Sequence, residues 1–195
     1  SIYGTGGNFA HTILEKFYCN KIKYEDMITE FEDAWLTLKI VGLKFDRSNE
    51  EKDSKVREKY YMNLKHFFQN HNPINFKTIL EQFIIIKIGK YIFQGYIDLL
   101  IKDDNGNYII QDWKTSSIYK KNEIIEKAGQ LILYAEGLRQ LNIPLEKIKI
   151  RWNFMKYCNV TIKQINGKYK IRQIERCNLG EKLKSTAKIW LKKLG

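Results

Sequence analysis

Apolar residues recur at helical spacing through the first third of the chain. Met27, Phe31 and Trp35 follow one another at intervals of four, so they share one face of a helix. The same spacing continues through an aromatic-rich segment that ends at Asn70-His-Asn-Pro73, where a proline stops the pattern. The helices predicted from this periodicity cover residues 7–19, 24–41 and 50–69.

The middle third changes to short apolar runs separated by turn residues. Gly89-Lys90 and the sequence Asp-Asn-Gly-Asn at residues 104–107 are typical of hairpin turns, so the runs around them predict a three-strand meander. These strands are expected at residues 83–88, 91–101 and 108–113.

A helix and a strand follow the meander, and a strand, a crossover helix and a strand in that order usually lie parallel with a right-handed connection. We expect the helix at residues 123–141 and the strand at 148–155. A hairpin around Asn166-Gly167, with strands at 160–165 and 168–174, and a basic helix at 180–194 complete the predicted elements.

Length and composition favour one α/β domain. The chain has 195 residues, of which 44% are hydrophobic, and no repeat or Pro/Ser-rich linker divides it. We therefore predict a single domain over residues 1–195, cut from a longer protein because the chain begins at Ser1. Apolar runs are too short to span a bilayer, and three scattered cysteines indicate a reducing, cytoplasmic location.

The charge balance points to a polyanionic partner. Thirty-four Lys and Arg residues against 22 Asp and Glu give a net charge of +12, which draws nucleic acid in a salt-dependent way. A Lys-rich composition can also reflect an AT-rich genome, so charge supports a nucleic-acid partner without proving it. Lysines gather after the third strand, at Lys120 and Lys121, and in the last predicted helix, at Lys182, Lys184, Lys188, Lys192 and Lys193.

Two acids and an amine stand at the ends of neighbouring predicted strands. Asp98 and Asp112 supply the hard oxygen ligands that Mg²⁺ or Mn²⁺ prefers, and such a metal lowers the pKa of a bound water. Lys114 follows Asp112 by two residues and so projects from the same face, where it can orient water or stabilise a phosphate. Trp113 points the other way, which leaves its backbone carbonyl as a further metal ligand.

Taken singly these residues are weak signals, because an Asp that closes a strand is usually a turn residue. Their order is specific: Gly95-Tyr-Ile-Asp98, a hairpin, an apolar run and Asp112-Trp-Lys114 resemble the PD-(D/E)XK nuclease superfamily, in particular its RecB-like branch. The resemblance implies a restriction-endonuclease-like core of helix, three-strand meander, helix and strand. Here that core has a helical insertion after the first helix and a C-terminal hairpin plus helix.

Three further segments fit this resemblance. The segment from Gly7 to Glu15 is similar to the RecB-type first motif, whose histidine, here His11, is an additional metal ligand. Glu15 shares the helix face of His11. Gln130 and Tyr134 are similar to the family's Gln-x-x-x-Tyr signature and share a helix face directed at the site. Glu81 matches a glutamate found before the first core strand, and its role, like that of Glu15, stays open.

The sequence also departs from the family pattern. Ile97 stands where the nominal proline precedes the first acid, and Asp112 replaces a glutamate; both variants are common in the RecB-like branch. Some members hold an iron-sulfur cluster with four cysteines. Cys19, Cys158 and Cys177 include no Cys-x-x-Cys pair, so we predict no cluster and no structural zinc.

The function expected from the resemblance is metal-dependent hydrolysis of DNA, by an exonuclease or an endonuclease, with a helicase as a partner in recombination, repair or phage DNA processing. His11, Asp98 and Asp112 would hold the metal, while Lys114, Gln130 and Tyr134 would assist. Alternatives are a cap-snatching-like RNA endonuclease, an inactive nucleic-acid-binding module of the same fold, and a structural subunit whose basic last helix docks on an acidic partner.

Overall fold

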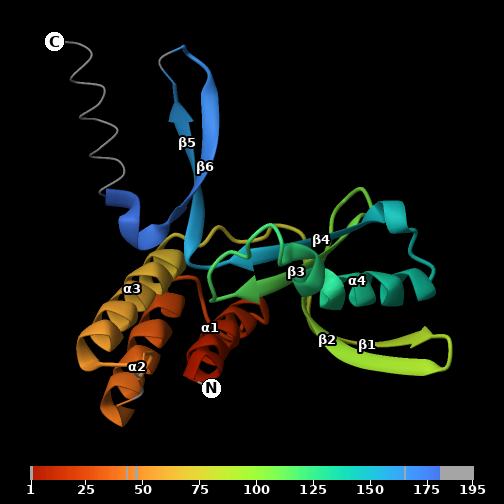
Figure 1. The fold of residues 1–195 in the computed structure, drawn as a ribbon. Helices are drawn as coiled ribbons and strands as arrows, with labels where there is room; N and C mark the ends of the chain where they lie inside the picture. Colours follow the sequence, from red (N-terminus) through yellow and green to blue (C-terminus); the bar gives the residue numbers. More distant parts are fainter. Residues whose placement is uncertain (1, 43, 47, 165, 181–195) are drawn as a thin grey trace. The chain divides into compact units, whose positions relative to one another are not determined.

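This computed structural model contains a mixed four-stranded sheet in the order β1-β2-β3-β4 (Figure 1). The structure describes residues 2–42, 44–46, 48–164 and 166–180. The described residues group into two compact units: one contains residues 11–24 and 72–154, and the other contains the described residues of 2–10, 25–71 and 155–180. We call these the sheet unit and the helical unit, and each is described by itself. The single domain expected from the sequence stays a prediction.

The sheet unit contains the predicted meander. Strands β1 (Lys77–Ile88), β2 (Tyr91–Lys102) and β3 (Tyr108–Lys114) pair antiparallel in sequence order. Strand β4 (Ile148–Phe154) pairs parallel to β3, as expected for a strand that follows a crossover helix. β1 begins six residues earlier than the periodicity indicated. The sequence pattern missed residues 77–82 because they alternate between exposed and half-buried positions that are only weakly apolar.

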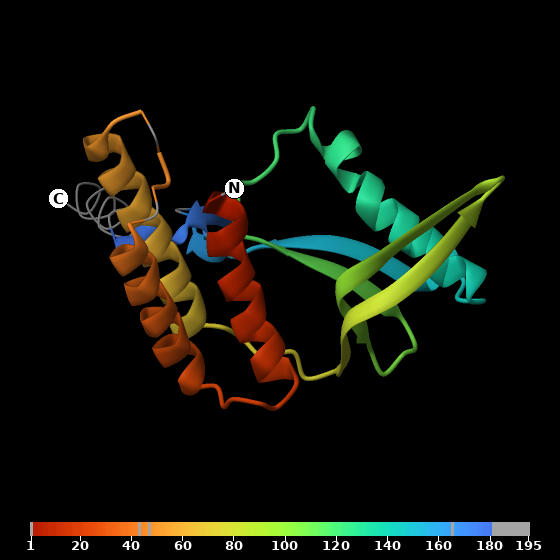
Figure 2. The ribbon, with the colours of Figure 1, turned by 90° about the horizontal axis from the view of Figure 1, so that it is seen from below.

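The crossover helix α4 (Ile124–Gln140) covers one face of this sheet (Figure 2). Its Leu131, Tyr134 and Leu138 join a buried cluster with residues of β1, β2 and β3. Gly137 allows α4 to approach β1 closely, since a Cβ at this position would lie 2.5 Å from Cδ1 of Ile84. The short 3₁₀ helix η1 (Leu145–Lys147) then leads into β4.

Helix α1 (Ile2–Tyr18) brings aromatic and imidazole rings to Trp113 of β3. The Tyr18 ring stacks on the Trp113 ring at 5.9 Å between centroids, and the His11 ring meets it edge-on at 6.1 Å. Trp113 is only 2% exposed, so it anchors the second half of α1 to β3. The second half of α1 thus lies on the face of the sheet opposite α4 at Trp113, since Trp113 and Ile110 of the α4 cluster project from opposite faces of β3.

The helical unit contains the insertion predicted from the first third of the sequence. α2 (Asp26–Val41) and α3 (Glu50–Gln69) pack through aromatic side chains, with Trp35 stacked on Tyr60 and Phe31 against Phe68. The hairpin of β5 (Tyr157–Lys163) and β6 (Tyr169–Glu175) follows, and then the 3₁₀ helix η2 (Arg176–Asn178).

The α/β fold is thus the one predicted: helix, insertion, meander, crossover helix, parallel strand and hairpin. The basic helix predicted at residues 180–194 falls outside the described residues except for Gly180. None of the described helices is both long enough and apolar enough to cross a membrane.

Candidate active site

Strands β2 and β3 separate where the two predicted catalytic acids lie. Their pairing ends with Leu99 opposite Gln111, although β2 continues to pair with β1 and β3 with β4. The next residues along, Asp98 and Asp112, therefore flank an opening between the strands. The backbone N–H of Trp113, which the ladder no longer uses, donates to Oδ2 of Asp98 at 3.2 Å.

The two acids and the lysine are joined by direct contacts. Nζ of Lys114 lies 2.7 Å from Oδ2 of Asp112, and the two side chains are 28% and 12% exposed. A hydrogen bond between the carboxyl groups of Asp112 and Asp98 lowers the pKa of Asp98 and raises that of Asp112. The sequence prediction that these three side chains converge is consistent with this geometry.

Burial controls the proton affinity of these groups. It raises the pKa of Asp112 to about 6; the hydrogen bond and charge of Lys114 oppose this increase but do not cancel it, and the nearby Asp98 carboxylate adds a smaller increase. Burial likewise raises the pKa of Asp98. For Lys114 burial lowers the pKa, but the ion pair with Asp112 outweighs it and leaves the pKa raised. The lysine is therefore a charged ammonium at neutral pH, suited to bind a phosphate oxygen and not to act as a base.

His11 contacts both strands at the opening. Its Nδ1 lies 3.5 Å from Oδ2 of Asp98. Burial lowers the pKa of His11, although Asp112 and a hydrogen bond with the Trp113 backbone oppose this effect. A backbone group raises the pKa of a histidine by accepting from the ring N–H, so the acceptor is the Trp113 carbonyl. That carbonyl is thus close to His11, and its role as a metal ligand stays a prediction.

Glu81 occupies a strained position beside the acids. The β1–β2 ladder is paired on both sides of it, Leu80 with Leu99 and Gln82 with Ile97, which leaves Glu81 opposite Asp98. Its φ of 46° is left-handed, a conformation that costs a non-glycine residue about 1 kcal/mol or more. The structure corrects the expectation that Glu81 precedes the first strand: it lies within β1.

Glu15 belongs to the same acidic surroundings. Partial burial raises the pKa of Glu81, and the carboxylate of Glu15 raises it further. The negative charge of Glu81 in turn contributes to the raised pKa of Asp98. Glu81 therefore lies within electrostatic reach of Asp98, and Glu15 lies within electrostatic reach of Glu81. A divalent cation would relieve the repulsion among them.

Gln130 and Tyr134 form a pair on α4, but only one of them is exposed. Nε2 of Gln130 donates to Oη of Tyr134 at 2.9 Å. Tyr134 is 8% exposed and packs in the core cluster, while Gln130 is exposed. We expected both side chains to reach the site or its substrate. Because Tyr134 is packed against β2, only the exposed Gln130 is available for a substrate contact.

Sequence reasoning missed why a glycine stands three residues before Asp98. A Cβ on Gly95 would lie 2.8 Å from Oη and 3.0 Å from Cε1 of Tyr134, closer than packed atoms approach. The Tyr134 ring therefore packs directly on the backbone of Gly95 in β2, where no side chain fits. The spacing of the motif contained this glycine, but its partner on α4 is revealed only by the fold.

The residue types at the site suit a divalent cation. Asp98 and Asp112 carry the hard oxygen donors that Mg²⁺ or Mn²⁺ prefers, and the lowered pKa of His11 keeps its imidazole neutral, the form in which histidine binds a metal. Among the described residues, however, no three His, Cys, Asp or Glu side chains are grouped closely enough to hold an ion. The Lys114 ammonium, which pairs with Asp112, supplies the positive charge there.

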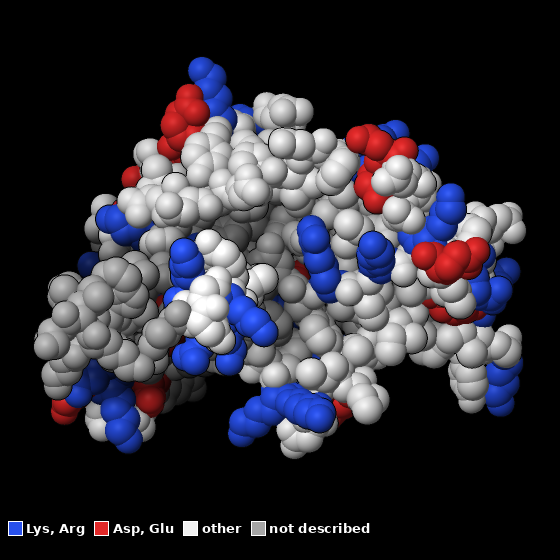
Figure 3. All heavy atoms as spheres, turned by 90° about the horizontal axis from the view of Figure 1, so that it is seen from above, with Lys and Arg blue, Asp and Glu red and all other residues white. Residues whose placement is uncertain are grey.

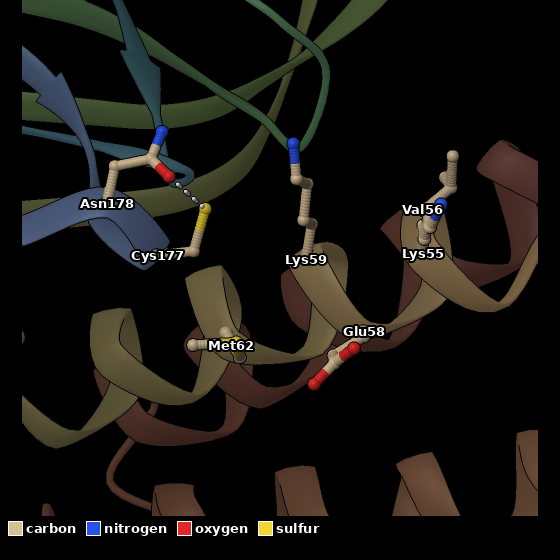
Figure 4. Close-up of a pocket in the computed structure, with 7 residues that line it drawn as sticks. All are labelled: Lys55, Val56, Glu58, Lys59, Met62, Cys177 and Asn178. Atoms are coloured by element: carbon tan, nitrogen blue, oxygen red, sulfur yellow. Dashed lines mark hydrogen bonds between the residues drawn. The ribbon is translucent and has the colours of Figure 1, made fainter. Parts of the chain in front are cut away.

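A separate pocket of about 370 Å³ lies in the helical unit (Figure 4). It is lined by Lys55, Val56, Glu58, Lys59, Met62, Cys177 and Asn178. Sγ of Cys177 donates to Oδ1 of Asn178 at 3.6 Å, and burial raises the pKa of this thiol. A protonated thiol is a poor nucleophile, and the carboxylate pair is absent from this lining, so we assign the chemistry to the sheet unit.

The comparison with protein families agrees with the fold and these motifs. A family model of the PD-(D/E)XK nuclease superfamily matches residues 4–190, which is nearly the whole chain. The chain belongs to the PD-(D/E)XK nuclease superfamily. No curated protein sequence matches it. Nucleases of this superfamily are generally hydrolases that typically use divalent metals.

Proposed function

We propose that this protein is a divalent-metal-dependent DNA nuclease of the RecB-like branch. The observation that carries the proposal is the opening between β2 and β3, at which Asp98, Asp112 and Lys114 are in contact. The RecB-like assignment is supported by His11, which comes from the first helix and lies 3.5 Å from Asp98. It is also supported by the hydrogen-bonded Gln130–Tyr134 pair on the helix after the catalytic strand.

Each side chain has a role that follows from its surroundings. Asp98, Asp112 and the neutral imidazole of His11 would hold Mg²⁺ or Mn²⁺, and the bound metal would supply an activated water and a Lewis acid. The Lys114 ammonium binds a non-bridging oxygen of the scissile phosphate and stabilises the charge that grows there as water attacks phosphorus. Gln130 is exposed beside Tyr134 and contacts the substrate backbone.

Charge favours a nucleic-acid substrate over other phosphodiesters. The chain carries a net charge of +12, and on the face shown in Figure 3 many Lys and Arg side chains are spread among fewer acidic ones. Such a surface binds phosphate backbones without reading their bases. We further propose a helicase as a partner and a reducing cell interior as the location. The three cysteines, which are free thiols in the structure, are compatible with that location.

The test is cleavage of circular and end-labelled DNA in Mg²⁺ or Mn²⁺, comparing the wild type with Asp112→Ala and with Asp33→Ala. Asp33 is an exposed acid on α2 and serves as the matched control. We expect Asp112→Ala to lose cleavage at least 10³-fold, roughly the loss of a metal's charge stabilisation, while folding and DNA binding persist. Asp33→Ala should cleave like the wild type.

Retained Mn²⁺-dependent cleavage by Asp112→Ala would rule out the assignment. An RNA endonuclease would cut RNA and spare DNA in the same assay. An inactive binding module would bind DNA without cutting it, and calorimetric titration would then find no Mn²⁺ site that depends on Asp98.

A further inference from the structure

An aromatic cluster lies one strand away from the catalytic acid and lysine. In the parallel β3–β4 pair, Trp152 is the register partner of Asp112 and Phe154 is the register partner of Lys114. Register partners on neighbouring strands project from the same face at a spacing of about 4.8 Å. The two aromatic side chains therefore lie directly beside the proposed catalytic residues, on the same face of the sheet.

Tyr119, from the loop after β3, completes this cluster. Its ring meets Trp152 at 5.0 Å and Phe154 at 5.2 Å between centroids, edge to face in both cases. It is also close enough to Lys114 to contribute to the raised pKa of that ammonium. The loop thus returns to the catalytic strand, and it places an aromatic ring beside the proposed phosphate-binding lysine.

The cluster is held firmly and still reaches the surface. Trp152 packs against the buried cluster under α4. Trp152 in turn contacts the rings of Tyr119 and Phe154 and so anchors them. Tyr119, Trp152 and Phe154 are each half-buried, and the next two residues, Lys120 and Lys121, are exposed. No two of the three rings are stacked in parallel, and because each ring is half-buried, part of it remains open to another planar group. Aromatic rings beside cationic side chains are the usual means of holding single-stranded nucleic acid.

We propose that Tyr119, Trp152 and Phe154 form a platform on which an unpaired base of the substrate stacks, next to the phosphodiester that is cut. This inference rests on the proposed function and adds its substrate class: the nuclease acts on single-stranded nucleic acid, or on strands unpaired at the site of cleavage. A base held in a duplex keeps its own stacking neighbours and cannot settle on these rings.

Binding without metal tests the platform independently of cleavage. The probe is a single-stranded oligonucleotide with one 2-aminopurine, whose fluorescence is quenched when the base stacks, in buffer that contains EDTA. We expect quenching by the wild type, by Tyr119→Phe, which keeps the ring, and by Tyr169→Ala. Tyr169 is an exposed tyrosine of β6 in the helical unit and provides the matched control.

Tyr119→Ala and Phe154→Ala should lose the quenching and bind the strand about 5- to 150-fold more weakly, the range for removal of one base–aromatic stack. Circular dichroism and thermal unfolding show whether each variant is folded, and Tyr119, which lies in a loop, decides the matter if Phe154→Ala is unstable. Wild-type affinity and quenching in a folded Tyr119→Ala protein would overturn the platform. Tighter binding of the duplex form of the probe, without quenching, would overturn it as well.

A cleavage experiment then relates the platform to the chemistry. An abasic site next to the scissile bond should slow the wild type but change little for Tyr119→Ala, since that variant has already lost the stack. Equal slowing of both proteins would contradict the inference. Quenching by a wild-type protein that cuts nothing would support the platform as a binding site while refuting the proposed nuclease.

Discussion

Gly95→Ala offers a sharp test of how the catalytic strand and α4 fit together. The added Cβ would lie 2.8 Å from Oη, 3.0 Å from Cε1 and 3.3 Å from Cζ of Tyr134. Tyr134 is 8% exposed and packed among core residues, so its ring cannot swing away as a surface side chain would. Overpacking of this kind costs about 1–3 kcal/mol of unfolding free energy.

The second change, Tyr134→Phe, removes the nearest clashing atom. By itself it deletes the hydrogen bond from Gln130, at a cost of about 0.5–1 kcal/mol because the exposed Gln130 amide returns to water. In the double variant the contact at 2.8 Å is gone, while those at 3.0 and 3.3 Å remain. The double variant should therefore be about 1 kcal/mol more stable than the sum of the single effects predicts.

Urea unfolding of the four proteins measures this coupling, with parallel cleavage assays in Mg²⁺ and Mn²⁺. We expect Gly95→Ala to lower cleavage roughly 10- to 100-fold, because Asp98 is three residues away on the strand that must shift. Additive free energies, within about 0.3 kcal/mol, would refute the claim that the Tyr134 ring rests on Gly95. A Gly95→Ala protein as stable as the wild type would refute it too.

Two further perturbations test the core and the electrostatics of the site. Gly137→Ala should lower the unfolding free energy by about 1–3 kcal/mol, because its Cβ would lie 2.5 Å from Ile84. Gly129→Ala on the same helix places its Cβ within 4 Å of nothing and should raise the unfolding free energy by up to about 1 kcal/mol through helix propensity. Denaturant unfolding measures both variants, and equal effects would contradict the packing of Gly137 against Ile84. With the pKa of Asp112 raised from 3.8 to about 6, the folded protein binds more protons than the unfolded chain between these values, so metal-free stability should fall by about 2 kcal/mol as pH rises from 4 to 7 relative to Asp112→Asn. Parallel stability curves for the two proteins would be inconsistent with a buried carboxyl at this position.

The order of elements and the acidic pair could be predicted from the sequence because both depend on short-range pattern. Spacings of four residues identified the helices that contain Phe31 and Tyr60, and turn residues marked the meander. Asp112 and Lys114 share a face because alternate residues of a strand do so, whatever the strand packs against.

No short-range sequence pattern indicated the boundaries of β1 or the conformation of Glu81. Residues 77–82 form a strand because β2 pairs with them along its whole length, not because they are strongly apolar. A glutamate is unfavourable in the left-handed region, so its φ of 46° opposite Asp98 is imposed by its surroundings. Local propensity cannot anticipate a conformation that only neighbouring strands enforce.

The sequence alone therefore determined which residues are available for chemistry: two acids, a lysine, a histidine and a Gln-x-x-x-Tyr pair, each on a predictable element. The tertiary structure decided how they meet. It separates β2 from β3 at the acids, places His11 3.5 Å from Asp98, seats Tyr134 on Gly95 and sets Tyr119 beside Trp152 and Phe154. Those contacts join residues far apart in the chain, and only the packing of helices on both faces of one sheet brings such residues within a few ångströms.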